Sequence, residues 1–233
     1  APLYFLSQAT QMKRFLIING IQQQVSDNPI TNPNALYVLW GGANDYLGGG
    51  ITDPTVTVGN LSIQIQTLIG RGATNILVPN LSNLGELPVT LNTLNSAPLN
   101  TLTQFHNLGL AASINSLSQS NSGVNLRLLD VNSLFNQIVA NPADAGFDNV
   151  TSQCITTTSV CGTPDTYLFW DDIHPTTAGH RLIGEFAFNT VSPTAVPEPI
   201  SMLGSLMAFG SAIAFKRKIK ASNLKQQELV EST

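Results

Sequence analysis

Three short apolar runs, separated by segments with helical spacing, constrain the fold of this chain more than any other feature. The runs are residues 35–40 (ALYVLW), 76–78 (ILV) and 124–129 (VNLRLL). Short, continuous apolar runs predict buried strands. Strands that alternate with helices indicate an α/β protein with a parallel sheet and right-handed crossovers.

The segments around these runs place apolar residues three or four positions apart, which predicts helices. The predicted helices are residues 3–25, 54–70, 94–117, 132–139 and 176–188. We therefore expect the order α-β-α-β-α-β-α-loop-α, with a single domain over residues 1–190. Sites in such sheets lie at the carboxyl ends of the strands.

The charge content limits the partners that this chain can bind. Only 10% of the residues are charged, well below the usual quarter. The surface must therefore be covered by neutral polar groups. No basic stripe precedes residue 200, so we expect no nucleic-acid binding.

Two cysteines, Cys154 and Cys161, lie in the Thr-rich loop before the last predicted helix. No further Cys or His stands at ligand spacing beside them, which argues against a zinc site. Two free thiols and a disulfide both remain open. A disulfide would stabilise the fold by roughly 2–3 kcal/mol in the chain-entropy model and would indicate an exported protein.

The carboxyl-terminal part differs from the rest in composition. Residues 191–199 are a Pro-rich linker, and residues 200–215 are apolar and uncharged. Lys216, Arg217 and Lys218 follow, and residues 219–233 form a polar tail. We expect residues 200–218 to form a membrane-spanning or sorting helix with the folded domain outside the cell, although a buried amphipathic helix is the alternative.

The loop WGGANDYLGGG follows the first predicted strand and spans residues 40–50. Glycine and asparagine are common in turns, so Asn44 could simply serve a chain reversal. Alternatively, the Asn44 amide could donate a hydrogen bond to a substrate at the end of the strand.

A second polar cluster, FWDDIHPTTAGH, spans residues 169–180 and leads into the last predicted helix. Its spacing lets a carboxylate reach the imidazole of His174, which would fix the tautomer of a catalytic base. The spacing favours Asp171, and the choice between Asp171 and Asp172 stays open. Pro175 and the following threonines suit a helix start, so solvated acids before a helix are the plain alternative. A metal site of Asp171, Asp172 and His174 is a weaker possibility, and His106 is expected on a helix surface.

Together the two clusters resemble the SGNH/GDSL hydrolase family of esterases and lipases over residues 35–188. GGAND resembles the family's G-x-N-D block, and WDDIHP resembles its D-x-x-H-P block. The resemblance implies a flavodoxin-like three-layer α/β sandwich and a serine esterase without metal or organic cofactor. His174 would be the general base, Asp171 would orient it, and Asn44 would donate to the oxyanion.

The same resemblance implies substrate contacts in the glycine-rich loop. Gly42 and Trp40 would lie against the substrate together with Asp45, although Asp45 also suits a role in bracing the turn. The substrate would be a carboxylic ester, either a lipid acyl ester or an acetylated glycan.

The family's nucleophile lies in a G-D-S block that these 233 residues do not contain. Ser7 lies within a helical pattern and is not assigned this role. We expect that the chain is truncated, that it is inactive alone, and that its first strand, residues 35–40, forms an exposed apolar edge. A non-catalytic surface-anchored binding protein on the same scaffold is the alternative.

The tail resembles the bacterial PEP-CTERM sorting signal, because VPEP precedes the apolar segment and the basic cluster. This resemblance implies export and cleavage near residues 197–199 by a sorting transpeptidase. A retained tail would instead anchor the protein to the membrane through residues 200–215.

Overall fold

Four short strands form a parallel sheet in the computed structural model, which describes residues 3–7 and 20–192. They are β1 (Leu3–Ser7), β2 (Leu36–Trp40), β3 (Asn75–Pro79) and β4 (Asn125–Leu129), in this order across the sheet. The middle residues of β2 and β3 are buried, as continuous apolar runs require. The predicted α/β class with a parallel sheet is therefore confirmed.

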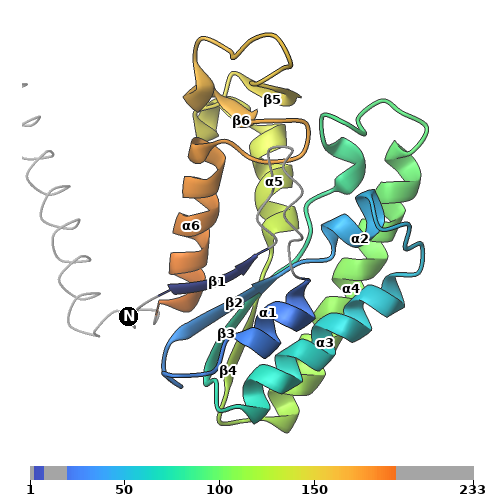
Figure 1. Ribbon diagram of the computed structural model, residues 1–233. Coiled ribbons are helices and arrows are strands. Elements are labelled where there is room, and N and C mark those ends of the chain that lie inside the picture. Colours follow the sequence, from blue (N-terminus) through green and yellow to red (C-terminus); the bar gives the residue numbers. More distant parts are fainter. Residues whose placement is uncertain (1–2, 8–19, 193–233) are drawn as a thin grey trace, which may run out of the picture. The chain divides into compact units, whose positions relative to one another are not determined.

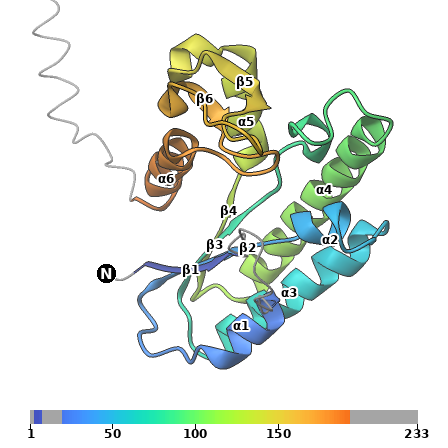
Figure 2. The same ribbon diagram turned by 45° about the horizontal axis from the view of Figure 1, so that its top comes forward.

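Helices cover both faces of this sheet (Figures 1 and 2). On one face lie α1 (Ile21–Asp27), α3 (Pro54–Gly70) and α4 (Ser96–Ser120), and on the other lie α5 (Val131–Ala140) and α6 (Thr177–Val191). Because strand side chains alternate between faces, Ile76 and Val78 join the core against α3 and α4, whereas Leu77 joins the other core. The result is three layers.

Local sequence signals set the starts of two helices. Asp53 accepts a hydrogen bond from the backbone N–H of Thr55 at 2.9 Å, and Pro54 occupies the first turn of α3. Asp130 caps α5 in the same way, through the N–H of Ser133 at 3.1 Å. The helix predicted over residues 54–70 is confirmed with the same bounds.

The long loop predicted around the cysteines contains regular structure. Strands β5 (Asn149–Gln153) and β6 (Tyr167–Phe169) form a second, two-stranded parallel sheet. The 3₁₀ turns η2 (Pro142–Ala145) and η3 (Pro164–Thr166) accompany them, and η1 (Leu84–Glu86) follows β3. β5 is mostly polar and only partly buried, and β6 has only three residues, so neither presents a hydrophobic run long enough to identify a strand.

The prediction of one helix over residues 3–25 is wrong. Residues 3–7 form β1, and the helix α1 starts only at Ile21; residues 8–19 lie outside the described part. β1 pairs in parallel with the whole of β2, from Leu3 beside Leu36 to Ser7 beside Trp40. The predicted exposed edge at β2 is therefore also wrong, because β1 covers it. The apolar run LYFL suits a strand or a helix equally well, and the partner strand decides between them.

The expected helix over residues 200–215 and the polar tail lie outside the described residues. Within residues 3–7 and 20–192, no helix combines the length and apolar character needed to span a bilayer.

Candidate active site

The two clusters singled out in the sequence follow strands of the two sheets. β2 runs through Gly41 into the short helix α2 (Ala43–Leu47), and β6 runs into the loop of residues 170–176. Ala43 and Ile173, the neighbours of Asn44 and His174 in the chain, pack against the same hydrophobic cluster. Residues 130 positions apart thus contribute to one core.

A tight turn holds the Asp171–His174 segment. The N–H of Trp170 donates to the carbonyl oxygen of His174 at 2.7 Å and closes the turn. Inside it, Oδ1 of Asp171 accepts the backbone N–H groups of Ile173 at 2.9 Å and His174 at 2.6 Å. The carboxylate therefore replaces backbone acceptors within the turn, as Asp side chains commonly do.

The same carboxylate binds the imidazole. Nδ1 of His174 lies 2.8 Å from both Oδ1 and Oδ2 of Asp171. Burial raises the pKa of Asp171, but the N–H donors of His174 and Ile173 and the imidazole lower it more, so the net pKa lies below its ordinary value. A carboxylate at Nδ1 favours the tautomer with its proton on Nδ1, which leaves Nε2 of His174 as the basic nitrogen.

Asp172 makes no such contact. Its side chain is exposed, and its carbonyl oxygen accepts the N–H of Val89 at 3.1 Å. The structure thus separates the two adjacent acids: Asp171 binds His174, whereas the backbone of Asp172 binds the loop after η1.

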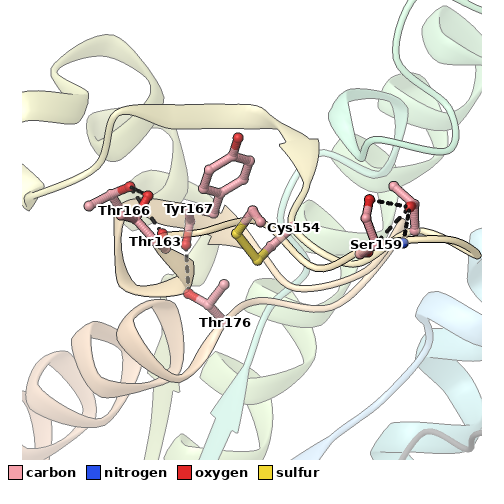
Figure 3. Close-up of a disulfide and its surroundings, with 8 residues drawn as sticks. Cys154, Ser159, Thr163, Thr166, Tyr167 and Thr176 are labelled. Carbon is pink, nitrogen blue, oxygen red and sulfur yellow. Dashed lines mark hydrogen bonds between the residues drawn. A yellow bond between two sulfur atoms is a disulfide. The ribbon is translucent and has the colours of Figure 1, made fainter.

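The start of α6 is fixed to β6 directly after His174. The hydroxyl of Thr176 donates to the carbonyl oxygen of Tyr167 at 2.7 Å (Figure 3) and accepts the N–H of Gly179 at 3.2 Å. Gly179 is buried, and a Cβ at this position would lie 2.9 Å from Pro175 Cβ. This packing holds the His174 turn against a rigid helix.

Cys154 and Cys161 form a disulfide, which decides between the two possibilities left by the sequence (Figure 3). Cys154 is buried, and its N–H donates to the carbonyl oxygens of Phe169 at 3.0 Å and Trp170 at 3.1 Å. Since Trp170 directly precedes Asp171, the cross-linked loop is anchored one residue away from the catalytic candidate.

The glycine-rich loop forms α2, with Asn44 at its second position. The carbonyl oxygen of Asn44 accepts the N–H groups of Gly48 at 3.1 Å and Gly49 at 2.8 Å. Asp45 is fixed to α3, because the hydroxyl of Thr57 donates to its Oδ2 at 3.0 Å. This contact gives Asp45 a bracing role, and its role in substrate binding stays a prediction.

The expectation that His106 lies on a helix surface is wrong. His106 is 0% exposed, and its Nδ1 lies 2.9 Å from the phenol oxygen of Tyr46 in α2. Gly42 lies against it with φ +110°, and a Cβ at Gly42 would approach His106 Cε1 to 2.8 Å. The apolar spacing of α4 gives no sign of this contact, because a histidine fits either face of a helix.

Trp40 is the remaining residue predicted for the site. It ends β2, is half-buried and packs against the core cluster that also borders Ala43 and Ile173. In the described part of the chain, no group of three or more His, Cys, Asp or Glu side chains is placed to hold a metal ion.

A polar groove of about 540 Å³ lies between α4 and the starts of the loops after β3 and β4. Its amides mainly support the loop after β3: Asn80 donates to Asp130 at 2.8 Å, and Asn107 both donates to and accepts from the backbone of Leu81. The groove is lined by none of the residues predicted for the site.

Comparison with known proteins places the chain in a family. The GDSL-like Lipase/Acylhydrolase family matches residues 9–187, and the chain belongs to this family.

Three relatives illustrate the match. Esterase EstA of Pseudomonas aeruginosa is 30% identical over 207 residues, which cover 82% of this chain and 31% of EstA. A Pseudomonas putida protein, described as an uncharacterized protein in the trpE-trpG intergenic region, is 30% identical over 188 residues, covering 72% of this chain and 31% of that protein. An acetylesterase of Thermothelomyces thermophilus is 26% identical over 196 residues, covering 78% of this chain and 59% of the acetylesterase. The chain thus spans about a third of the two bacterial relatives.

Proposed function

We propose that this chain carries the base and the oxyanion donor of a serine esterase that hydrolyses carboxylic esters. The observation that carries the proposal is the contact of the Asp171 carboxylate with Nδ1 of His174 at 2.8 Å. Family membership and the names of the relatives support ester hydrolysis as the reaction class.

In the proposed mechanism, Nε2 of His174 takes the proton of a serine hydroxyl as that oxygen attacks the ester carbonyl carbon. Asp171 holds the imidazole in place and stabilises the imidazolium. The side-chain amide of Asn44 donates to the oxyanion of the tetrahedral intermediate. His174 then returns the proton to the leaving alcohol, and water releases the acid in a second cycle of the same steps.

No motif identifies the nucleophilic serine, because the 233 residues contain no G-D-S block. We place it in a G-D-S block outside the 233 residues. Ser7 is the second candidate, because it ends β1 in register with Trp40, at the carboxyl end of a parallel strand. The helical pattern that argued against Ser7 does not hold in this segment.

Two assays test the proposal: labelling with a serine-directed fluorophosphonate, and turnover of p-nitrophenyl acetate. In the protein that includes the serine nucleophile, His174→Ala should lower kcat by about 10²–10⁴-fold and abolish labelling. His180→Ala is the matched control, since His180 has an exposed side chain on α6. Turnover that survives His174→Ala would overturn the proposal, and loss of labelling in Ser7→Ala would assign the nucleophile to Ser7.

The substrate is proposed as a short acyl ester or an acetylated glycan, with a lipid acyl ester as the alternative. The acetylesterase among the relatives supports the short acyl group. Comparing p-nitrophenyl acetate with p-nitrophenyl octanoate distinguishes the two classes, because a site for lipid acyl groups would favour the longer chain.

We also propose that the protein is exported and sorted through its carboxyl-terminal tail. The disulfide supports an oxidising compartment, since such bonds are rare in reducing ones. VPEP, the apolar residues 200–215 and the basic cluster support recognition by a sorting transpeptidase. The intact mass of the mature protein tests this, because cleavage near residues 197–199 removes the tail and a membrane anchor retains it.

A further inference from the structure

A buried histidine on α4 holds the short helix that carries Asn44. His106 is 0% exposed and contacts Tyr46 in two ways: Nδ1 lies 2.9 Å from the phenol oxygen, and the two rings pack edge to face with centroids 5.7 Å apart. Among the described residues, the buried Nε2 of His106 has no hydrogen-bond partner. An unpaired buried N–H is rarer than an unpaired acceptor. The tautomer with its proton on Nδ1 is therefore favoured, and Nδ1–H donates to Tyr46.

A second side-chain hydrogen bond holds the residue next to Asn44. The hydroxyl of Thr57 in α3 donates to Oδ2 of Asp45 at 3.0 Å. His106 and Thr57 thus bind two successive residues of α2, Tyr46 and Asp45, from two different helices.

We propose that His106 is a positioning residue that acts through Tyr46 to hold the Asn44 amide in its oxyanion-binding orientation. The inference rests on the proposed function, in which Asn44 is the donor. α2 has only five residues and no side-chain cap at its start, so its own hydrogen bonds define its position poorly. His106 and Thr57 fix the two residues that follow Asn44 to the long helices α4 and α3.

The backbone before Asn44 is fitted to the same imidazole. Gly42 approaches His106 so closely that a Cβ would meet its Cε1, and its φ of +110° suits glycine. The ring therefore contacts the chain on both sides of Asn44, at Gly42 and at Tyr46. An apolar side chain of similar volume would fill the space but would leave the Tyr46 hydroxyl without this partner.

Amide hydrogen exchange of the 233-residue chain tests the positioning without any need for turnover. The N–H groups of Gly48 and Gly49 report on α2, because both donate to the carbonyl oxygen of Asn44. Tyr46→Phe and His106→Leu should accelerate their exchange about tenfold or more. The amide of Asn141, bonded to Gln137 at the end of α5, is the control and should keep its rate.

His106→Asn is the rescue variant. Its side-chain amide places a nitrogen near the position of Nδ1, so it can donate to Tyr46 and should restore slow exchange. If His106→Leu does not fold, Tyr46→Phe gives the same readout after the loss of one oxygen atom. Unchanged exchange at Gly48 and Gly49, or equal acceleration at Asn141, would overturn the proposal.

A double-mutant cycle of Tyr46→Phe and Asn44→Ala tests whether the position of the Asn44 amide affects kcat. In the protein that hydrolyses p-nitrophenyl acetate, Tyr46→Phe should lower kcat about tenfold with KM nearly unchanged, as expected for an interaction made in the transition state. In an Asn44→Ala background the same change should have no further effect on kcat. Additive losses would overturn the inference. An Asn44→Ala variant with unchanged kcat would instead contradict the oxyanion role in the proposed function, while the exchange result tests the positioning independently.

Discussion

Nδ1 of His174 lies 2.8 Å from both carboxylate oxygens of Asp171, whose Oδ1 also accepts two backbone N–H groups of the same turn. The carboxylate thus shapes the turn and orients the imidazole. One side chain does both because the turn brings the backbone N–H and the ring of His174 to the same side of Asp171.

In the protein that includes the serine nucleophile, replacing Asp171 with Asn should lower kcat for ester hydrolysis by about 10⁴-fold, because an amide can stabilise the wrong imidazole tautomer. Asp172→Asn is the matched control and should stay close to wild type, since the Asp172 side chain is exposed. Steady-state kinetics on p-nitrophenyl acetate measure both variants. Equal losses in the two variants would contradict the assignment of Asp171.

Stability should fall between pH 6.5 and pH 4 because of His106. Burial lowers the pKa of His106 from 6.5 to about 4. Above pH 6.5 the imidazole is neutral in both states, whereas at lower pH the unfolded state binds a proton that the folded state does not. The free energy of unfolding should therefore decrease by roughly 3 kcal/mol across this window.

Urea denaturation at several pH values checks this decrease. The His106→Asn variant has no imidazole at this position and should show a flatter profile. The low pKa of Asp171 acts in a different window: its stabilising contribution is lost only as the pH falls below the ordinary value of 3.8. A wild-type profile without slope between pH 6.5 and pH 4 would contradict the role assigned to His106.

Gly42→Ala should destabilise the fold by about 1–3 kcal/mol, because alanine rarely adopts a positive φ and the new Cβ would meet His106. Gly59→Ala is the control: Gly59 lies in α3, and a Cβ there has no neighbour within 4 Å. That change should stabilise the helix by about 0.5–1 kcal/mol. Thermal unfolding followed by circular dichroism measures both, and opposite signs are expected.

Removing the disulfide by Cys154→Ala together with Cys161→Ala should lower the free energy of unfolding by roughly 2–3 kcal/mol. The cross-linked loop is anchored to Trp170, so the variant should also lose activity through a less ordered Asp171–His174 turn. Oxidised wild-type protein and its dithiothreitol-reduced form provide an independent comparison. Identical stability of the reduced and oxidised proteins would refute the prediction.

The sequence predicted the helices and strands whose hydrophobic patterns are strong. The helix of residues 54–70 has its observed bounds, and three strands of the main sheet were found from apolar runs of three to six residues. β5 shows no hydrophobic pattern because its residues are mostly polar and only partly buried, and the run LYFL of β1 is too short to distinguish a strand from a helix. Spacing favoured Asp171 as the partner of His174, because the two lie three positions apart, and the structure decided it against Asp172.

The chain by itself determined what is local: the strand runs, the caps at Asp53 and Asp130, and the Asp171–His174 turn, because each depends on residues close together in sequence. The tertiary structure alone decided what joins distant segments. It brought His106 against Tyr46 across 60 positions, covered β2 with β1, and linked Asp45 to Thr57 in α3. A histidine suits a helix surface as well as a core, and only the packing of α4 against α2 settles which environment it occupies.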